Sequence, residues 1–227
     1  MISIRAVTMI AAGWVCCLLC VQQHAAHAGV ITATNAQFAN VDGGILAKRP
    51  VTFLGSEPGF ALGAIADVNI TIEFAKADGT NPNPPYPTTF DPFFNEINFE
   101  LISPNGTSVM LIPVNTFPGA PATNAFNGLV YDGTITLDDE AAQTVNIQAM
   151  LAGMPNSGAF RPVNPLSAFD GLNALGTWQL WIGDEVGDDT LRFRSYTLTI
   201  TTVPEPTSWA CWGLAMGALV LLRQPHR

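Results

Sequence analysis

The sequence predicts an all-β domain built as an antiparallel β-sandwich. Short segments such as Val68–Phe74 and Ile97–Leu101 alternate apolar and polar residues, which is typical of strands with one buried face. Residues that favour turns separate these segments, and the central part of the chain has no apolar stripe of helical period and helix length. Closely spaced strands without helices between them favour two packed antiparallel sheets over a parallel sheet.

The strands can be placed in chain order. We expect them at Val51–Leu54, Val68–Phe74, Ile97–Leu101, Ser108–Ile112, Thr134–Leu137, Thr177–Ile182 and Arg192–Thr201. The turn sequence Ser103-Pro104-Asn105-Gly106 joins two of them into a hairpin. The segment Lys76–Phe94 is rich in proline, which excludes a central strand and predicts a long loop.

The reactive residue types lie outside the central segment. The cysteines are Cys16, Cys17, Cys20 and Cys211, and the histidines are His24, His27 and His226. Between Gly29 and Pro206 there is therefore no Ser-His-Asp triad, no Cys-His pair, no zinc site on His or Cys, and no disulfide. Carboxylate chemistry and metal sites made of oxygen ligands stay open.

The central segment is strongly acidic. It holds 18 Asp and Glu residues, and its basic residues are Lys48, Arg49, Lys76, Arg161, Arg192 and Arg194. Such a surface repels nucleic acid and anionic lipid and attracts cations, so we expect no nucleic-acid partner. Solubility outside the cell explains the same charge equally well.

The N-terminal residues have the pattern of a secretory signal peptide. Arg5 precedes the apolar run Val7–Val21, and Ala26-His27-Ala28 places small residues at the cleavage positions. We expect residues 1–28 to be removed before Gly29 and the exported domain to occupy residues 29–202.

The C-terminal residues form a second targeting pattern. Val203-Pro204-Glu205-Pro206 is followed by the apolar run Trp209–Leu222 and by Arg223. As a helix this run spans roughly 21 Å, short of a hydrocarbon core of about 30 Å, so a weak single-pass anchor is one interpretation. The order also resembles the PEP-CTERM signal of bacterial exported proteins. That resemblance implies that residues 203–227 form a transient membrane anchor, which an exosortase removes in the cell envelope.

Three groups of motifs carry a further resemblance. They are Leu101–Thr107, the acidic stretch Thr136–Ala141, and a longer series that includes Gly158–Pro162, Leu166–Gly171, Gly176–Leu180 and Asp184. In this order they resemble the P domain (Homo B domain) of proprotein convertases over residues 65–200. The resemblance implies a jelly-roll-type sandwich without catalytic residues that supports a subtilisin-like protease. Leu191 and Tyr196 depart from the glycine and tryptophan usual in that family, so we expect the final hairpin to differ locally.

The loop 184–189 is the best candidate for a metal site. Asp184, Glu185, Asp188 and Asp189 offer closely spaced carboxylates, which calcium prefers. A solvated hairpin tip is the alternative. Asp138 and Asp139 offer a second site, or converge on the first.

The two tryptophans Trp178 and Trp181 are expected on opposite faces of one strand, because their spacing is odd. We expect Trp178 in the core. Trp181 then points outward or toward a second layer, with a sugar-stacking platform as an alternative.

The favoured function is an exported, non-catalytic surface or matrix module that binds a partner such as polysaccharide. The alternative is an accessory domain for a subtilisin-like endopeptidase on another chain. A glycosidase that uses paired carboxylates is the third hypothesis, for which fold alone is no argument.

Overall fold

The computed structural model describes residues 28–60, 63–79, 84–85, 92–117, 130–147, 150 and 156–203. Ten strands and two short 3-10 helices are present in this part of the chain. The strands are β1 (Gly29–Asn35), β2 (Ala39–Val41), β3 (Ile45–Phe53), β4 (Ala64–Lys76), β5 (Ile97–Ile102), β6 (Ser108–Ile112), β7 (Tyr131–Leu137), β8 (Asn156–Phe160), β9 (Gly176–Asp184) and β10 (Leu191–Val203). The helices are η1 (Phe94–Glu96) and η2 (Leu166–Phe169).

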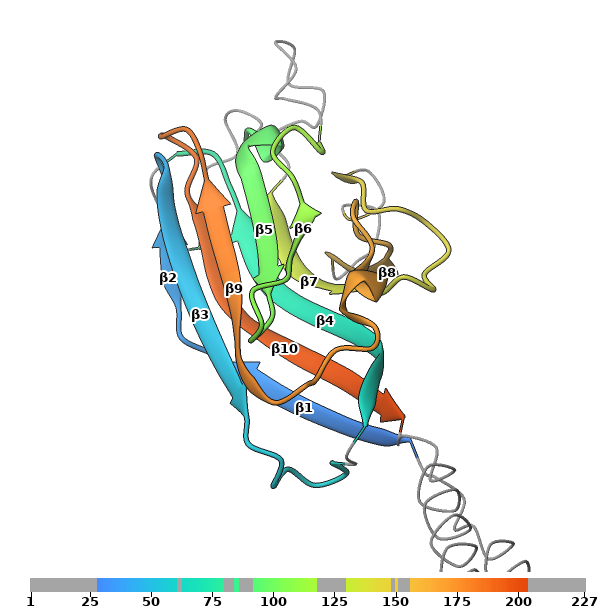
Figure 1. Ribbon diagram of the computed structural model, residues 1–227. Helices are drawn as coiled ribbons and strands as arrows, with labels where there is room; N and C mark the ends of the chain where they lie inside the picture. Colours follow the sequence, from blue (N-terminus) through green and yellow to red (C-terminus); the bar gives the residue numbers. More distant parts are fainter. Residues whose placement is uncertain are drawn as a thin grey trace, which may run out of the picture.

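The strands form two sheets that pack face to face, as the sequence predicted (Figure 1). One sheet has the order β1-β10-β4-β7-β8, with β2 pairing the beginning of β10, and the other has the order β3-β9-β5-β6. All the predicted strands are present, and β1, β2 and β8 are additional.

One pairing departs from the predicted antiparallel pattern. Strand β8 runs parallel to β7, with Gly133 opposite Asn156 and Leu137 opposite Phe160. A parallel neighbour requires a long connection, and the chain between Leu137 and Asn156 supplies it. The alternation of residues within each strand does not depend on strand direction, so the sequence could not distinguish the two arrangements.

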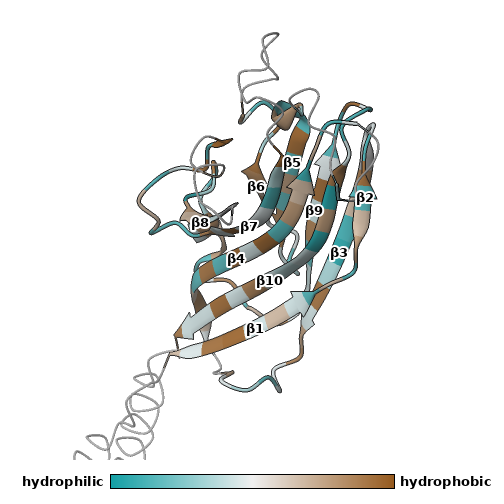
Figure 2. Cartoon of the chain, turned by 180° about the vertical axis from the view of Figure 1, so that it is seen from behind, coloured by the Kyte–Doolittle hydropathy of each residue, from teal (hydrophilic) through white to brown (hydrophobic). Residues whose placement is uncertain are grey.

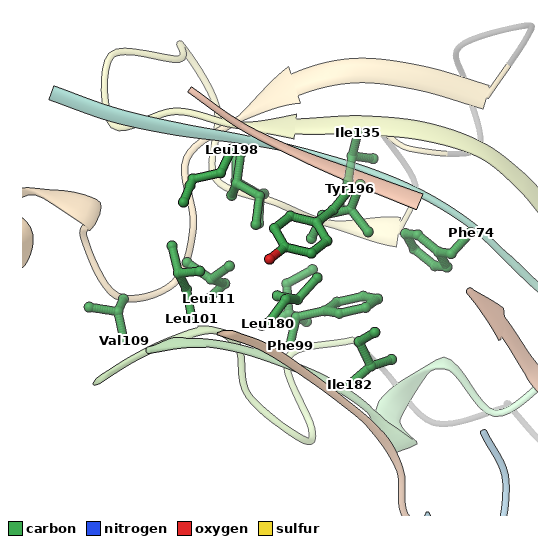
Figure 3. Close-up of a cluster of buried hydrophobic side chains, with 14 of the residues drawn as sticks. Phe74, Phe99, Leu101, Val109, Leu111, Ile135, Leu180, Ile182, Tyr196 and Leu198 are labelled. Atoms are coloured by element: carbon green, nitrogen blue, oxygen red, sulfur yellow. The ribbon is translucent and has the colours of Figure 1, made fainter. Parts of the chain in front are cut away.

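The core lies between the two sheets and is filled by aromatic and branched side chains (Figure 3). Phe74 of β4 and Phe99 of β5 meet edge to face across the sheets, with ring centroids 5.2 Å apart. Trp178 is fully buried and packs edge to face on Phe169 of η2 at 5.0 Å. Its indole N–H donates to the carbonyl of Ala174 at 2.9 Å. The predicted core position of Trp178 is therefore confirmed.

Alternation along the strands explains why the sheets pack this way. Figure 2 shows apolar and polar residues alternating along β4 and β10. In β4 the residues Val68, Ile70, Ile72 and Phe74 all point inward and are buried. A sandwich buries one such face of each sheet and leaves the other to water.

The start of the first strand and the end of the last strand lie side by side at one corner of the sandwich. Gly29 at the start of β1 pairs with Thr202 near the end of β10, and Val203 pairs with Ala64 (Figure 1). The hydroxyl of Thr202 also donates to the carbonyl of Gly29 at 3.4 Å. Among the described residues, no helix is long and apolar enough to cross a membrane.

Candidate functional site

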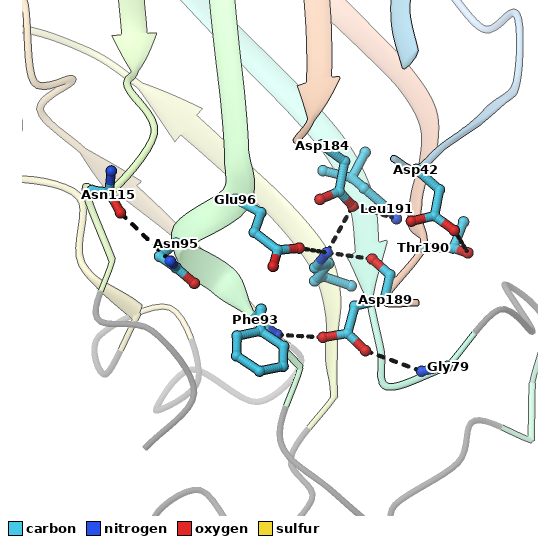
Figure 4. Close-up of polar contacts among 11 residues, drawn as sticks. Asp42, Gly79, Phe93, Asn95, Glu96, Asn115, Asp184, Asp189, Thr190 and Leu191 are labelled. Atoms are coloured by element: carbon cyan, nitrogen blue, oxygen red, sulfur yellow. Dashed lines mark hydrogen bonds and ion pairs between the residues drawn. The ribbon is translucent and has the colours of Figure 1, made fainter. Parts of the chain in front are cut away.

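A cluster of buried charged residues joins the two sheets at the end of the sandwich away from the paired chain ends. Lys76 is the last residue of β4, Asp184 is the last residue of β9, and Glu96 ends η1. The Lys76 ammonium donates to Asp184 Oδ2 at 2.7 Å, to Glu96 Oε2 at 3.4 Å, and to the backbone carbonyl of Asp189 (Figure 4). Lys76 and Asp184 are 0% exposed. Three acceptors match the three donor hydrogens of an ammonium group.

The side chain of Asp189 holds three segments of chain together. Its carboxylate accepts the backbone N–H of Phe93 at 2.7 Å and that of Gly79 at 3.2 Å (Figure 4). Gly79 and Phe93 flank the prolines of the segment Lys76–Phe94 on either side in the sequence. One buried carboxylate on the β9–β10 connection therefore holds both Gly79 and Phe93.

The charges within the cluster do not balance. Burial raises the pKa of Asp184 to about 7, although the Lys76 ammonium acts in the opposite direction. Burial also raises the pKa of Glu96. Two carboxyl groups that share one buried ammonium retain a proton, since a second unpaired negative charge in a dry site is costly. Asp184 Oδ1 is buried and makes no hydrogen bond.

Between its two buried ends, the β9–β10 connection is exposed. Glu185 and Asp188 are exposed, whereas Asp184 and Asp189 are buried. Strands β9 and β10 lie in different sheets, so this connection is not the hairpin that the sequence predicted. Its left-handed backbone conformation falls at Asp188, with φ of 94°. Leu191 lies in β10 instead, is fully buried, and donates its N–H to Asp184 Oδ2 at 3.0 Å. A residue other than glycine is thus accommodated at Leu191, because no positive φ is needed there.

Of the four carboxylates in the loop 184–189 that were predicted to bind calcium, two are buried and two are exposed. Asp184 pairs with Lys76, Asp189 accepts two backbone N–H groups, and Glu185 and Asp188 face solvent. In the part of the chain that the structure describes, no three acidic side chains are grouped closely enough to hold a metal ion. Calcium at this loop stays a prediction.

The second acidic stretch does not converge on the first. Leu137, just before Asp138, pairs with Ile70 of β4, while the loop 184–189 lies at Lys76. Six residues of strand separate them by about 20 Å. Asp139 accepts the backbone N–H groups of Leu166 and Ser167 at 2.9 and 2.8 Å. Asp138 accepts the N–H of Glu140 at 2.8 Å. Asp138 therefore shapes its local turn, whereas Asp139 holds the start of η2, 27 residues further along the chain.

Trp181 lies on the outer face of β9, opposite to Trp178, as the spacing predicted. It is partly exposed, and its indole N–H donates to Gln179 Oε1 at 3.0 Å. The ammonium of Lys48 lies 3.9 Å from the centroid of its ring. This ring is accessible at the surface of the second sheet.

The targeting residues fall largely outside the described residues. Ala26, Pro204, Glu205, Pro206 and Arg223 lie there. Ala28 immediately precedes β1, and Val203 is the last residue of β10. The boundaries of the exported domain stay a prediction.

Sequence reasoning missed Lys76 and Glu96. A signal for Lys76 was present, since it follows Val68, Ile70, Ile72 and Phe74 at the same inward parity. Asp184 likewise continues the inward series of Trp178, Leu180 and Ile182. Two opposite charges at inward positions predict a buried pair. Glu96 precedes its strand in a helical turn and gave no such signal.

Residues 91–200 match the family model of the proprotein convertase P-domain. The resemblance expected over residues 65–200 is thus confirmed over most of its length. P domains are accessory domains of proprotein convertases, which are subtilisin-like proteases. The match covers β5 to β10 and includes every residue of the cluster except Lys76.

The chain is also similar to several solved structures. FLHE has 11% identity and a TM-score of 0.36, covering 78% of this chain and 96% of that one. The complex of the Aeromonas sobria serine protease and the chaperone has 10% identity and a TM-score of 0.32, covering 82% and 29%. A β-porphyranase of glycoside hydrolase family 86 from Bacteroides plebeius has 10% identity and a TM-score of 0.36, covering 78% and 21%. The chain thus spans less than a third of the last two, and all three likenesses are weak. No curated protein matches the chain.

Proposed function

We propose that this protein is an exported, non-catalytic β-sandwich module that binds a partner at the cell surface or in the extracellular matrix. The observation that carries the proposal is the residue inventory between Gly29 and Pro206. That segment has no histidine and no cysteine. The strongest polar cluster in the described residues consists of an ammonium and carboxylates that bond one another and the backbone. Nothing in that cluster is an activated nucleophile.

The placement of the chain ends supports a tethered module. Gly29 and Thr202 are paired neighbours, so a signal peptide and a C-terminal anchor would both leave from one corner. Strand β4 runs from that corner to Lys76, a distance of roughly 40 Å. With the C-terminal segment in a membrane, the loops around the buried cluster point away from it. An exosortase-type protease would then release the module near Pro206.

Capture of the tagged protein from the envelope and the culture medium tests this function. We expect a surface protein or a polysaccharide in stoichiometric amount, and no hydrolysis of peptides by the captured material. Mass spectrometry and glycan analysis identify what is bound. Recovery of the chain alone, in the cytoplasmic fraction, would contradict the proposal.

The second candidate is an accessory domain for a subtilisin-like serine endopeptidase on another chain. The match of residues 91–200 to the P-domain favours it. A protease that is captured in stoichiometric amount, and that loses heat stability when the module is removed, supports this function. A captured protease whose stability is unchanged by the module would exclude it.

We also propose that the domain binds calcium, whichever of the two functions it has. At the loop 184–189 its ligands would come from the exposed Glu185 and Asp188, completed by backbone carbonyls and water, because Asp184 and Asp189 already bond Lys76 and two backbone N–H groups. Asp138 and Asp139 lie about 20 Å away and would belong to a separate site. A resident calcium ion stabilises the native state by mass action, so a chelator lowers the melting temperature. An unchanged melting temperature in chelator would exclude structural calcium.

A further inference from the structure

The outer faces of the two sheets differ in chemistry. The face formed by β1, β10, β4 and β7 carries rows of hydroxyl groups, which include Thr32, Thr34, Thr71, Thr136, Thr197 and Thr199. Pairs of them bond each other, as Thr34 and Thr197 do at 2.8 Å. The outer face of the four-stranded sheet instead has Trp181 at its centre. A partly exposed tryptophan on the outer face of a sheet is typical of protein interfaces.

The residues directly opposite Trp181 on the two neighbouring strands carry opposite charges, and these three residues form one row across the sheet. Lys48 of β3 pairs with Trp181 of β9, and Glu100 of β5 pairs with Trp181 from the other side. Two strand spacings, about 9.5 Å, separate Lys48 from Glu100. Lys48 contacts the Trp181 ring, and Glu100 accepts a bond from Ser108. Within the described residues, neither charge forms an ion pair.

In the next row across the sheet, the residues on β3 and β5 are both apolar. Pro50 of β3 and Ile102 of β5 flank Gln179 of β9. Pro50 is exposed and Ile102 is partly exposed. On both rows, therefore, the residue on β3 complements the residue on β5: cation with anion, and apolar with apolar.

We propose that this face binds the same face of a second copy of the chain. A two-fold axis parallel to β9 and lying between the copies places each β3 over the partner's β5. Lys48 then lies over the partner's Glu100, twice, and Pro50 lies over the partner's Ile102. Trp181 lies on the axis beside its own equivalent, and the Lys48 ammonium turns from the Trp181 ring toward the partner's Glu100. The contact is isologous and closes as a dimer, with the strands of the facing sheets aligned.

Charge selects this axis over its alternative. A two-fold axis perpendicular to the strands would place Lys48 over Lys48 and Glu100 over Glu100. Like charges that face each other in an interface cost several kcal/mol, whereas opposite charges fix the register. Association does not depend on export or on the partner proposed above, so the two proposals can fail separately.

Charge reversal tests the dimer in the full-length chain purified in detergent. Light scattering with size exclusion gives the mass of the protein component. We expect a dimer for the wild type. Lys48→Glu and Glu100→Lys should each weaken it at least about 100-fold, because each creates two like-charge contacts. The double variant Lys48→Glu/Glu100→Lys restores opposite charges and should restore the dimer.

Restoration of the dimer in the double variant would show that the single variants lose it through charge repulsion, and not through misfolding or an effect of the detergent. Thr199→Lys, on the outer face of the other sheet, is the control and should leave the dimer intact. Melting curves verify that each variant is folded. A monomeric wild type, single reversals that leave the dimer unchanged, or a double variant that stays monomeric would each overturn the proposal. Binding of a different protein at Trp181 by a monomeric chain would also overturn it.

Discussion

Lys76 and Asp184 belong to different sheets, and their side chains meet at 2.7 Å in the interior of the sandwich. Both are 0% exposed. The pair therefore joins β4 to β9 at the point where the apolar core ends. Its neighbours Glu96 and Asp189 extend it into a cluster that fixes the chain on either side of the proline-rich segment.

Removal of the buried cation is expected to be costly. Lys76→Met keeps much of the side-chain volume but leaves two buried carboxyl groups without their partner. Breaking a buried pair in this way costs about 3–5 kcal/mol of unfolding free energy. Urea unfolding measures it. Arg161→Met, at an exposed position, is the control and should change the free energy by less than about 0.5 kcal/mol. Equal effects of the two substitutions would contradict a stabilising role of the cluster.

Asp189→Ala is expected to loosen both ends of the proline-rich segment. The partly buried backbone N–H groups of Gly79 and Phe93 lose their acceptor, and each loss costs about 1 kcal/mol because water can reach the donor. Hydrogen exchange should therefore speed up at Gly79 and Phe93. Asp188→Gly is the matched control, because Asp188 is exposed and already has φ of 94°. Unchanged exchange in Asp189→Ala would show that its carboxylate does not hold these segments.

The stability of the wild type should depend on pH through Asp184. Its pKa is raised to about 7 in the folded protein, mainly by burial. A raised pKa gives stability that is fully present below the ordinary pKa of Asp, is lost as pH rises toward 7, and stays lost above it. In Asp184→Asn the group cannot ionise. The difference in unfolding free energy, wild type minus variant, should fall by up to about 1.4 kcal/mol per pH unit over this window. A pH-independent difference would contradict the account.

Two glycines with positive φ should respond differently to alanine. Gly59 has φ of 83°, and a Cβ there would lie 2.5 Å from the carbonyl oxygen of Val30. Gly106 has φ of 89°, but a Cβ there would meet nothing within 4 Å. Gly106→Ala should cost about 1 kcal/mol from backbone strain alone. Gly59→Ala should cost clearly more, because backbone atoms must also move. Thermal unfolding of both variants gives the comparison, and equal losses would contradict the predicted close approach.

The sequence predicted the sandwich because alternation is a local property. The strands around Val68–Phe74 and Ile97–Leu101 are where the pattern placed them. The hairpin at Asn105-Gly106 is also present, with Gly106 at positive φ. Strand β1 was not predicted, because the apolar residues Val30 and Ile31 point to opposite faces and obscure the alternation.

The candidate site was harder to predict because it is assembled from distant residues. The acidic loop drew attention to Asp184 and Asp189, but their partners Lys76, Gly79 and Phe93 lie far away in the sequence. Lys76 supplies the positive charge beside Asp184, while calcium at the loop 184–189 stays a prediction. The local clues were the inward positions of Lys76 in β4 and of Asp184 in β9.

The mass of the intact protein recovered from the envelope and the medium tests the central claim most directly. An exported module that is processed at both ends begins at Gly29 and ends close to Pro206. The account predicts that mass, with the unprocessed chain as a minor form. A protein that retains residues 1–28 and 207–227 in every fraction would contradict export and release.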